Sequence, residues 1–159
     1  LAGNGTHDYY ISRAKAAHVE VIDVVAYRQA PGIVNVIVWG SDEAISAVRI
    51  ALTSEASELL GVTVNVLPAE FVEFDISATV TVENHAPLNV AEVLETQLRA
   101  QADEAQAFGE MLSISQISAW LHAPDYVDKV TISEPMADIV PNHDALWEIG
   151  SVELEVIYD

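Results

Sequence analysis

Hydrophobic and polar residues alternate most regularly in residues 72–83, VEFDISATVTVE. A period of two places the two kinds of residue on opposite faces of a strand. The segment therefore predicts a long antiparallel strand with one buried and one solvated face. The apolar face comprises Val72, Phe74, Ile76, Ala78, Val80 and Val82. The polar face comprises Glu73, Asp75, Ser77, Thr79, Thr81 and Glu83.

A helix and a hairpin are predicted at the start of the chain. Thr6 is a candidate N-cap for a helix over 7–17, in which Tyr10, Ile11 and Ala14 share one side. The runs VEVIDVVAY (19–27) and IVNVIVW (33–39) are rich in β-branched residues. Because the turn Ala30-Pro31-Gly32 joins them, we expect the two strands to form a hairpin.

A second helix and a third strand follow before Pro68. Ser41-Asp42 is the expected cap of a helix over 43–60, which Gly61 ends. Its apolar face comprises Ile45, Val48, Leu52, Ala56 and Leu59. VTVNV (62–66) alternates as a strand does.

The region after the long strand predicts two more helices and two more strands. Capping boxes at Asn89–Glu92 and Ser113–Gln116 begin helices over 90–108 and 114–122. The first helix buries Leu94, Leu98, Ala105 and Phe108. Strands are expected over 127–133 and 151–159, with an irregular stretch from Glu134 to Asn142.

The order of elements predicts an α+β fold in two units with a boundary near Pro68. Residues 1–68 read α-β-β-α-β, and residues 69–159 read β-α-α-β-β. We expect two small α/β sandwich-like units, each with helices packed on a mostly antiparallel sheet.

Composition restricts the partners. The chain has 25 Asp and Glu against 6 Lys and Arg, a net charge of −19. Phosphate backbones and anionic lipid surfaces are bound through Lys and Arg, so nucleic acid and membrane are disfavoured as partners. The acidity fits a solvated surface, adaptation to salt, or a face for a basic partner. Cysteine is absent, which excludes disulfides and thiolate metal sites. No apolar run approaches the roughly 20 residues of a membrane span, and we interpret Leu1 as internal to a longer protein.

Residues 111–135 contain the ingredients of a hydrolase: Ser115, Ser118, His122 and Asp125. The first three share a helical face. A nucleophile also needs a strained, exposed position and an oxyanion hole, and no G-x-S-x-G motif is present. We interpret the stretch as structural: Ser113 caps a helix and the residues after it turn the chain into a strand. No catalytic residue and no enzyme activity are predicted.

Candidate metal and acid–base groups are equally weak. His7-Asp8 and His18 lie eleven residues apart, or about 16 Å along a helix, too far for one ion. His143-Asp144 is a turn-like pair. Glu73 and Asp75 lie roughly 7 Å apart on one strand face, where a solvated polar face explains them. We predict no metal and no cofactor.

Five stretches resemble the baseplate J-like family of contractile-tailed bacteriophages and prophages. They are GTHDYYISRAKAA, VIDVVAYRQAPGIVNVIVW, VEFDISATVTVE, LSISQISAWLHAPDYVDKVTISEPMADIV and LWEIGSVELEVI. Together they extend from about Gly5 to Ile157, and their order and spacing carry the likeness. The resemblance covers the C-terminal portion of the longer members of that family.

This resemblance implies a structural wedge subunit of a tail baseplate in the virion, assembled in the bacterial host cytoplasm. Its expected partners are other wedge proteins and neighbouring copies in the ring. An alternative is an acidic interaction module of a phage-like contractile injection apparatus outside a virion. Aromatic residues often anchor interfaces, so about two of five candidates should be exposed and should cluster. The candidates are Tyr9, Tyr10, Trp39, Trp147 and Tyr158.

Overall fold

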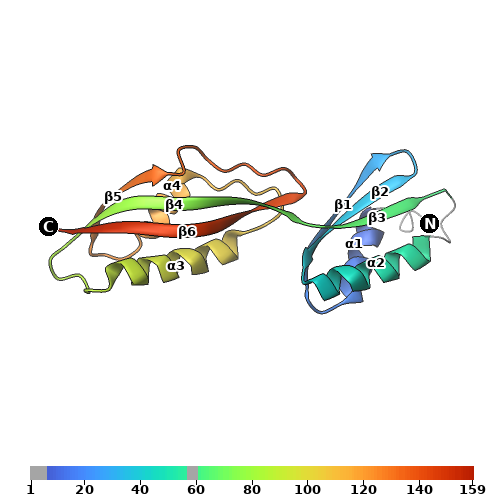
Figure 1. The fold of residues 1–159 in the computed structure, drawn as a ribbon, viewed down its shortest axis with the longest axis horizontal. Helices are drawn as coiled ribbons and strands as arrows, with labels where there is room; N and C mark the ends of the chain where they lie inside the picture. Colours follow the sequence, from blue (N-terminus) through green and yellow to red (C-terminus); the bar gives the residue numbers. More distant parts are fainter. Residues whose placement is uncertain (1–6, 57–60) are drawn as a thin grey trace. The chain divides into compact units, whose positions relative to one another are not determined.

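The computed structural model describes residues 7–56 and 61–159 (Figure 1). Thr6, Leu59 and the side chain of Ala56, which the sequence placed at a cap and on a helix face, lie outside the described residues. The chain forms two compact units, Leu1–Glu70 and Phe71–Asp159. The division falls two residues after the expected boundary at Pro68. Among the described residues, no helix has the length and apolar character that a membrane crossing requires.

Unit 1 packs two helices against a three-stranded sheet of order β1-β2-β3. Its elements are α1 (His7–Ala17), β1 (Val21–Ala30), β2 (Ile33–Gly40), α2 (Asp42–Ala56) and β3 (Thr63–Pro68). β1 and β2 form the expected antiparallel hairpin. β3 pairs in parallel with β2, because α2 carries the chain back across the sheet. At the hairpin turn, Gly32 has a φ of +77° and an added Cβ would lie 2.7 Å from the Gly61 carbonyl oxygen.

The core of unit 1 contains the predicted helix faces. Tyr10 and Ala14 of α1 are buried against Val36 and Val38 of β2. From α2, Ile45, Val48 and Leu52 join the same core. One polar side chain is buried here among the described residues, Asn35 at 6% exposure. It donates to the Tyr27 hydroxyl at 3.3 Å and accepts from Asn65 at 3.2 Å.

Unit 2 packs two helices on one face of a sheet of order β5-β4-β6. Its elements are β4 (Glu70–Val82), α3 (Val90–Ala105), α4 (Ile114–Leu121), β5 (Val127–Glu134) and β6 (Ala145–Tyr158). β5 is antiparallel to β4. β6 runs alongside β4 in the same direction (Figure 1). Contacts at both ends agree: Ser151 N donates to Asp75, and Asp159 N donates to the Val82 carbonyl.

The alternation of β4 is confirmed over most of its length. Ile76, Ala78, Val80 and Val82 are buried against the helices, while the residues between them face the open side. Phe74 packs against the core, but Val72 is exposed, because the core does not extend to this end of the strand. On the helices, the buried residues include Leu94, Leu98, Ala102, Ile117 and Leu121.

The α+β class is confirmed, but the sheets are not mostly antiparallel. In each unit the central strand has one antiparallel and one parallel neighbour. The helix that connects β2 to β3 returns the chain to the end of the sheet at which β2 began, which makes those strands parallel. In addition, β6 begins at Ala145, six residues before the expected start.

The helix caps differ from one another. Ser113 Oγ accepts from Gln116 N at 3.1 Å, and Ser41 Oγ accepts from Ala44 N at 3.1 Å, as predicted for N-caps. Asn89 stands at the start of α3 but makes no side-chain cap hydrogen bond, so the expected capping box there is wrong. Its backbone, at φ −100° and ψ 35°, lies outside the extended region in which an N-cap side chain reaches the first turn.

Candidate interaction surface

The five aromatic residues predicted as interface anchors divide between core and surface. Tyr10 and Trp147 are 1% and 2% exposed and belong to the two cores, so they are not surface anchors. Tyr9 and Trp39 are half-buried in unit 1. Tyr158 is 40% exposed, and its hydroxyl donates to the Pro87 carbonyl at 2.7 Å. Large rings gain most from burial, which explains why two of them leave the surface.

Exposed aliphatic residues mark the surface more strongly than the aromatic ones. In unit 2, Leu88 is 97% exposed and follows the Pro87 carbonyl that Tyr158 contacts. Met136 is 90% exposed, in the loop after β5. Met111 and Val140 flank the bridge between Leu112 and Ile139 and are also exposed. Unit 1 exposes Val19, Ile22 and Ile50.

These residues were not predicted from the sequence, because aromatic side chains were expected to anchor an interface, whereas the most exposed apolar side chains are aliphatic. A signal existed for Leu88, which stands in the polar segment NHAPLN between two predicted elements. Single apolar residues on a surface are common, and only those grouped in space indicate contact with another molecule.

The open face of the second sheet is acidic and carries hydroxyl groups. Glu73 and Asp75 of β4 and Glu153 and Glu155 of β6 are exposed there. A shallow trough of about 310 Å³ crosses this face. It is lined by Ser77, Ala78, Thr79, Ser133, Glu153, Leu154 and Glu155. Such a surface offers many acceptors and a negative potential to a basic partner.

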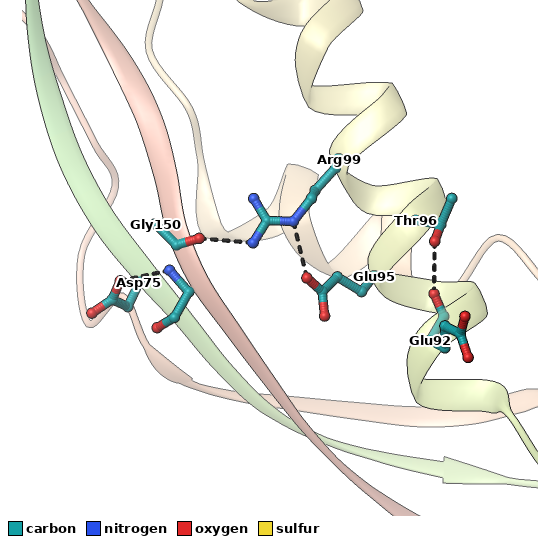
Figure 2. A network of polar contacts seen from close by, with 7 residues as sticks. Asp75, Glu92, Glu95, Thr96, Arg99 and Gly150 are labelled. Atoms are coloured by element: carbon teal, nitrogen blue, oxygen red, sulfur yellow. Dashed lines mark hydrogen bonds and ion pairs between the residues drawn. The ribbon is translucent and has the colours of Figure 1, made fainter.

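The positive charge of Arg99 is engaged within unit 2 (Figure 2). From α3, its guanidinium donates to Glu95 at 3.0 Å and to the Gly150 carbonyl of β6 at 2.7 Å. On the sheet, Asp75 accepts from Ser151 N at 2.9 Å. The absence of a side chain at Gly150 leaves room for the carboxylate of Asp75, since an added Cβ would lie 2.5 Å from Asp75 Oδ1.

Other cationic side chains are also engaged within the chain. In unit 1, Arg49 donates to the Val66 carbonyl at 3.1 Å, and Lys15 pairs with Asp23 at 3.4 Å. Both interactions tie a helix to a strand of the same sheet. The negative charge therefore dominates the surface that a partner meets.

The four residues with hydrolase-like spacing do not form a catalytic relay. In the part of the chain that the structure describes, no hydrogen bond joins the side chains of Ser115, Ser118, His122 and Asp125. The backbone N–H of His122 donates to the Ser118 carbonyl and ends α4. The structural interpretation of this stretch therefore accounts for the contacts that are present.

A histidine and two carboxylates that are distant in sequence come together in unit 1. Donor atoms of His18, Glu20 and Glu43 lie within 4.8 Å of one another. The partners that the sequence suggested for His18 are not among them: Asp8 is not in the group, and the side chain of His7 lies outside the described residues. Glu43 comes from the first turn of α2, so spacing along the sequence did not reveal the group.

Two features of this cluster disfavour a bound cation. His18 Nδ1 accepts from Glu20 N at 3.0 Å, which leaves the proton of a neutral ring on Nε2. Glu20 accepts from Ser41 Oγ at 2.7 Å, at the N-terminus of α2, where the positive end of the helix dipole opposes a cation. The negative charges of the carboxylates are instead stabilised by the positive end of the helix dipole.

Tyr10 carries a perturbed titration. Burial raises the pKa of its phenol above the ordinary value, because the charged form would lose its hydration. Its hydroxyl and Trp147 Nε1 are buried without a hydrogen-bond partner in the described part of the molecule. Both groups lie in the cores of their units. The raised pKa of Tyr10 therefore bears on the stability of unit 1.

No protein-family model matches the chain, and no relative is found among curated proteins.

Proposed function

We propose that this chain is a structural subunit of a contractile-tail baseplate of a bacteriophage or prophage, acting through contacts with other wedge proteins and neighbouring copies. The observation that carries the proposal is the apolar surface of both units. Ile22 and Ile50 in unit 1, and Leu88, Met136 and Val140 in unit 2, are large apolar side chains exposed to solvent. Apolar side chains that lie close together on a surface are typical of protein–protein contact sites, and Met111 and Val140 do so on either side of the bridge between Leu112 and Ile139.

The architecture suits a subunit that is held by several neighbours at once. Each unit has its own core beneath a sheet, so each presents a stable surface without depending on the other. Contacts that are weak one at a time become strong when several are made together. The order and spacing of the sequence stretches that resemble the baseplate J-like family support the same role.

The test is association with the products of neighbouring genes. Size-exclusion chromatography with light scattering should give a complex of defined stoichiometry when the chain is mixed with an adjacent tail protein. Leu88→Glu and Met136→Glu should weaken that complex, because each places a charge in an apolar contact. Gln101→Glu, at an exposed polar position of α3, is the matched control for surface charge.

Two outcomes would contradict the baseplate role. One is the absence of any complex with every tail protein encoded beside this gene. The other is a gene neighbourhood that encodes no tail, sheath or baseplate component. Circular dichroism of each variant establishes that the substitutions leave the fold intact.

A further inference from the structure

β6 is the longest edge strand among the described residues. It has 14 residues and lies at the end of the order β5-β4-β6. The other edges are interrupted or short. β1 has register shifts at both ends, β3 has 6 residues and ends at Pro68, and β5 has register shifts against β4. Bulges, prolines and short lengths are the ordinary protection of an edge against added strands.

The first half of the β6 edge is occupied by α3. Arg99 donates to the Gly150 carbonyl, as Figure 2 shows, and Gln106 donates to the Trp147 carbonyl. Arg99 lies in α3, and Gln106 is the C-cap residue that follows this helix. An incoming strand would have to displace them.

Among the described residues, no donor from α3 contacts the second half of the edge in this way. Asp159 N donates to the Val82 carbonyl, so the backbone of Asp159 faces β4. Because the N–H and C=O of alternate residues point to the same edge, the backbone groups of Val152, Leu154 and Val156 point outward. The alternation is interrupted at Gly150, whose added Cβ would face Asp75 and Glu73 of the open side, so the regular outward series begins at Val152.

The side chains along this open half define what would fit beside it. Val152, Leu154 and Val156 pack on the core but remain partly exposed, since β6 is the last strand in its sheet among the described residues. Glu153 and Glu155 are exposed on the opposite face. A strand added here would meet aliphatic side chains on one face and carboxylates on the other.

We propose that the β6 edge over residues 152–158 binds an extended segment of a partner protein in which Lys or Arg alternates with aliphatic residues. The backbone ladder supplies affinity, and the alternating side chains supply specificity. The basic residues pair with Glu153 and Glu155 across the strands, and the aliphatic ones extend the core beside Leu154. This inference rests on β6 and does not depend on the baseplate role.

A second copy of the chain is a poor occupant of this edge. Antiparallel pairing of two β6 strands about Leu154 would set Glu153 of one copy opposite Glu155 of the other. Like charges directly opposite each other destabilise a strand pair. At a net charge of −19 per chain, repulsion between copies adds to this cost.

The experiment uses the full chain and a fluorescent peptide of about eight residues in which Lys alternates with Val. Binding is measured by fluorescence polarisation, and hydrogen exchange of the amides of β6 locates the site. We expect binding, with added protection at Val152, Leu154 and Val156 and none in unit 1. A peptide of the same composition in scrambled order, and one with Glu in place of Lys, should bind at least about tenfold more weakly.

Charge-reversing substitutions distinguish recognition at the β6 edge from general electrostatic attraction between a basic peptide and the acidic chain. E153K/E155K should weaken binding of the Lys–Val peptide by about tenfold, because two cross-strand attractions become repulsions. The same variant should gain affinity for the Glu–Val peptide. E104K/E110K changes the net charge equally at two exposed positions outside residues 152–158 and should leave the affinity within about twofold.

Three results would overturn the proposal. They are no binding of the Lys–Val peptide up to about 1 mM, equal losses in both charge-reversal variants, or protection that appears outside β6. A dimer of the chain alone, with protected β6 amides, would assign the edge to a second copy instead. None of these results bears on complexes made through Leu88 or Met136.

Discussion

The buried hydroxyl of Tyr10 gives the sharpest test of the packing in unit 1. Tyr10 is 1% exposed, and within the described residues its hydroxyl has no hydrogen-bond partner. A hydroxyl that loses its water without gaining a partner costs about 1–3 kcal/mol. Tyr10→Phe removes this cost and keeps the ring, which packs edge-on against Tyr9 at a centroid distance of 5.5 Å. We expect the free energy of unfolding of unit 1 to rise by about 1 kcal/mol.

Native-state hydrogen exchange is the suitable assay, because two units with separate cores can open separately. Amides of β2, such as those of Val36 and Val38, report on unit 1, and amides of β4 serve as an internal control. A gain of about 1 kcal/mol slows exchange in β2 by about fivefold and leaves β4 unchanged.

Tyr27→Phe is the matched control with the opposite sign. The Tyr27 hydroxyl accepts from Asn35 Nδ2 at 3.3 Å, and Asn35 is buried. Removing the hydroxyl leaves the buried Asn35 donor without this partner. The free energy of unfolding of unit 1 should therefore fall by about 1 kcal/mol, and exchange in β2 should become faster. If Tyr10→Phe instead destabilised unit 1 by more than about 1 kcal/mol, its hydroxyl would have a partner and the reasoning would fail.

The pH dependence of Tyr10 follows from its raised pKa. The folded state holds the proton more tightly than the unfolded state, so this contribution to stability is complete below about pH 10 and is lost as the pH rises through the folded pKa. The advantage of Tyr10→Phe over the wild type should therefore widen at alkaline pH. An equal pH profile for the two proteins would contradict the assigned cause.

Three further substitutions test the rest of the fold. Leu98→Ala, at a fully buried position of α3, should destabilise unit 2 by about 3 kcal/mol in urea unfolding, whereas Leu88→Ala at an exposed position should have little effect. If hydrogen exchange of the β4 amides were slowed or unchanged in Leu98→Ala, the burial of Leu98 in the core of unit 2 would be contradicted. Ser113→Ala should cost about 1 kcal/mol by removing the cap of α4, while Asn89→Ala should be nearly neutral because Asn89 makes no cap hydrogen bond. Equal losses at both sites would mean that Asn89 caps α3 after all. Gly32→Ala should lower the thermal midpoint of unit 1, since its φ is +77° and the new Cβ would lie 2.7 Å from the Gly61 carbonyl oxygen; an unchanged midpoint would refute this strain.

Local patterns predicted the elements well and their pairing less well. The alternation in β4 and the spacing of Ile45, Val48 and Leu52 in α2 identified faces that are buried in the structure. The parallel pairing of β3 with β2 was missed, because pairing is decided by contacts between distant segments. The early start of β6 was missed because Ala145, Leu146 and Trp147 are buried in succession, which hides a period of two.

The surface was harder to predict than the core. An aromatic residue can serve either as a core or as an interface residue, so composition did not separate Tyr10 and Trp147 from Tyr158. The cluster of His18 and Glu20 with Glu43 is formed by the approach of α2 to the start of β1. The open edge of β6 depends on the order of strands in the sheet, which no local pattern contains.

The order of the strands also has a consequence for synthesis on the ribosome. Unit 1 has all its strands once Pro68 has emerged, whereas β4 ends at Val82 and its parallel partner begins at Ala145. The intervening roughly 60 residues take about 3–12 s to translate at 5–20 residues per second. Throughout this interval β4 lacks β6, and the Ser, Thr and acidic residues at its alternate positions keep one face soluble. Unit 1 should therefore fold first, and a nascent chain stalled near residue 120 should carry a folded unit 1 beside a second unit that is still open to proteolysis.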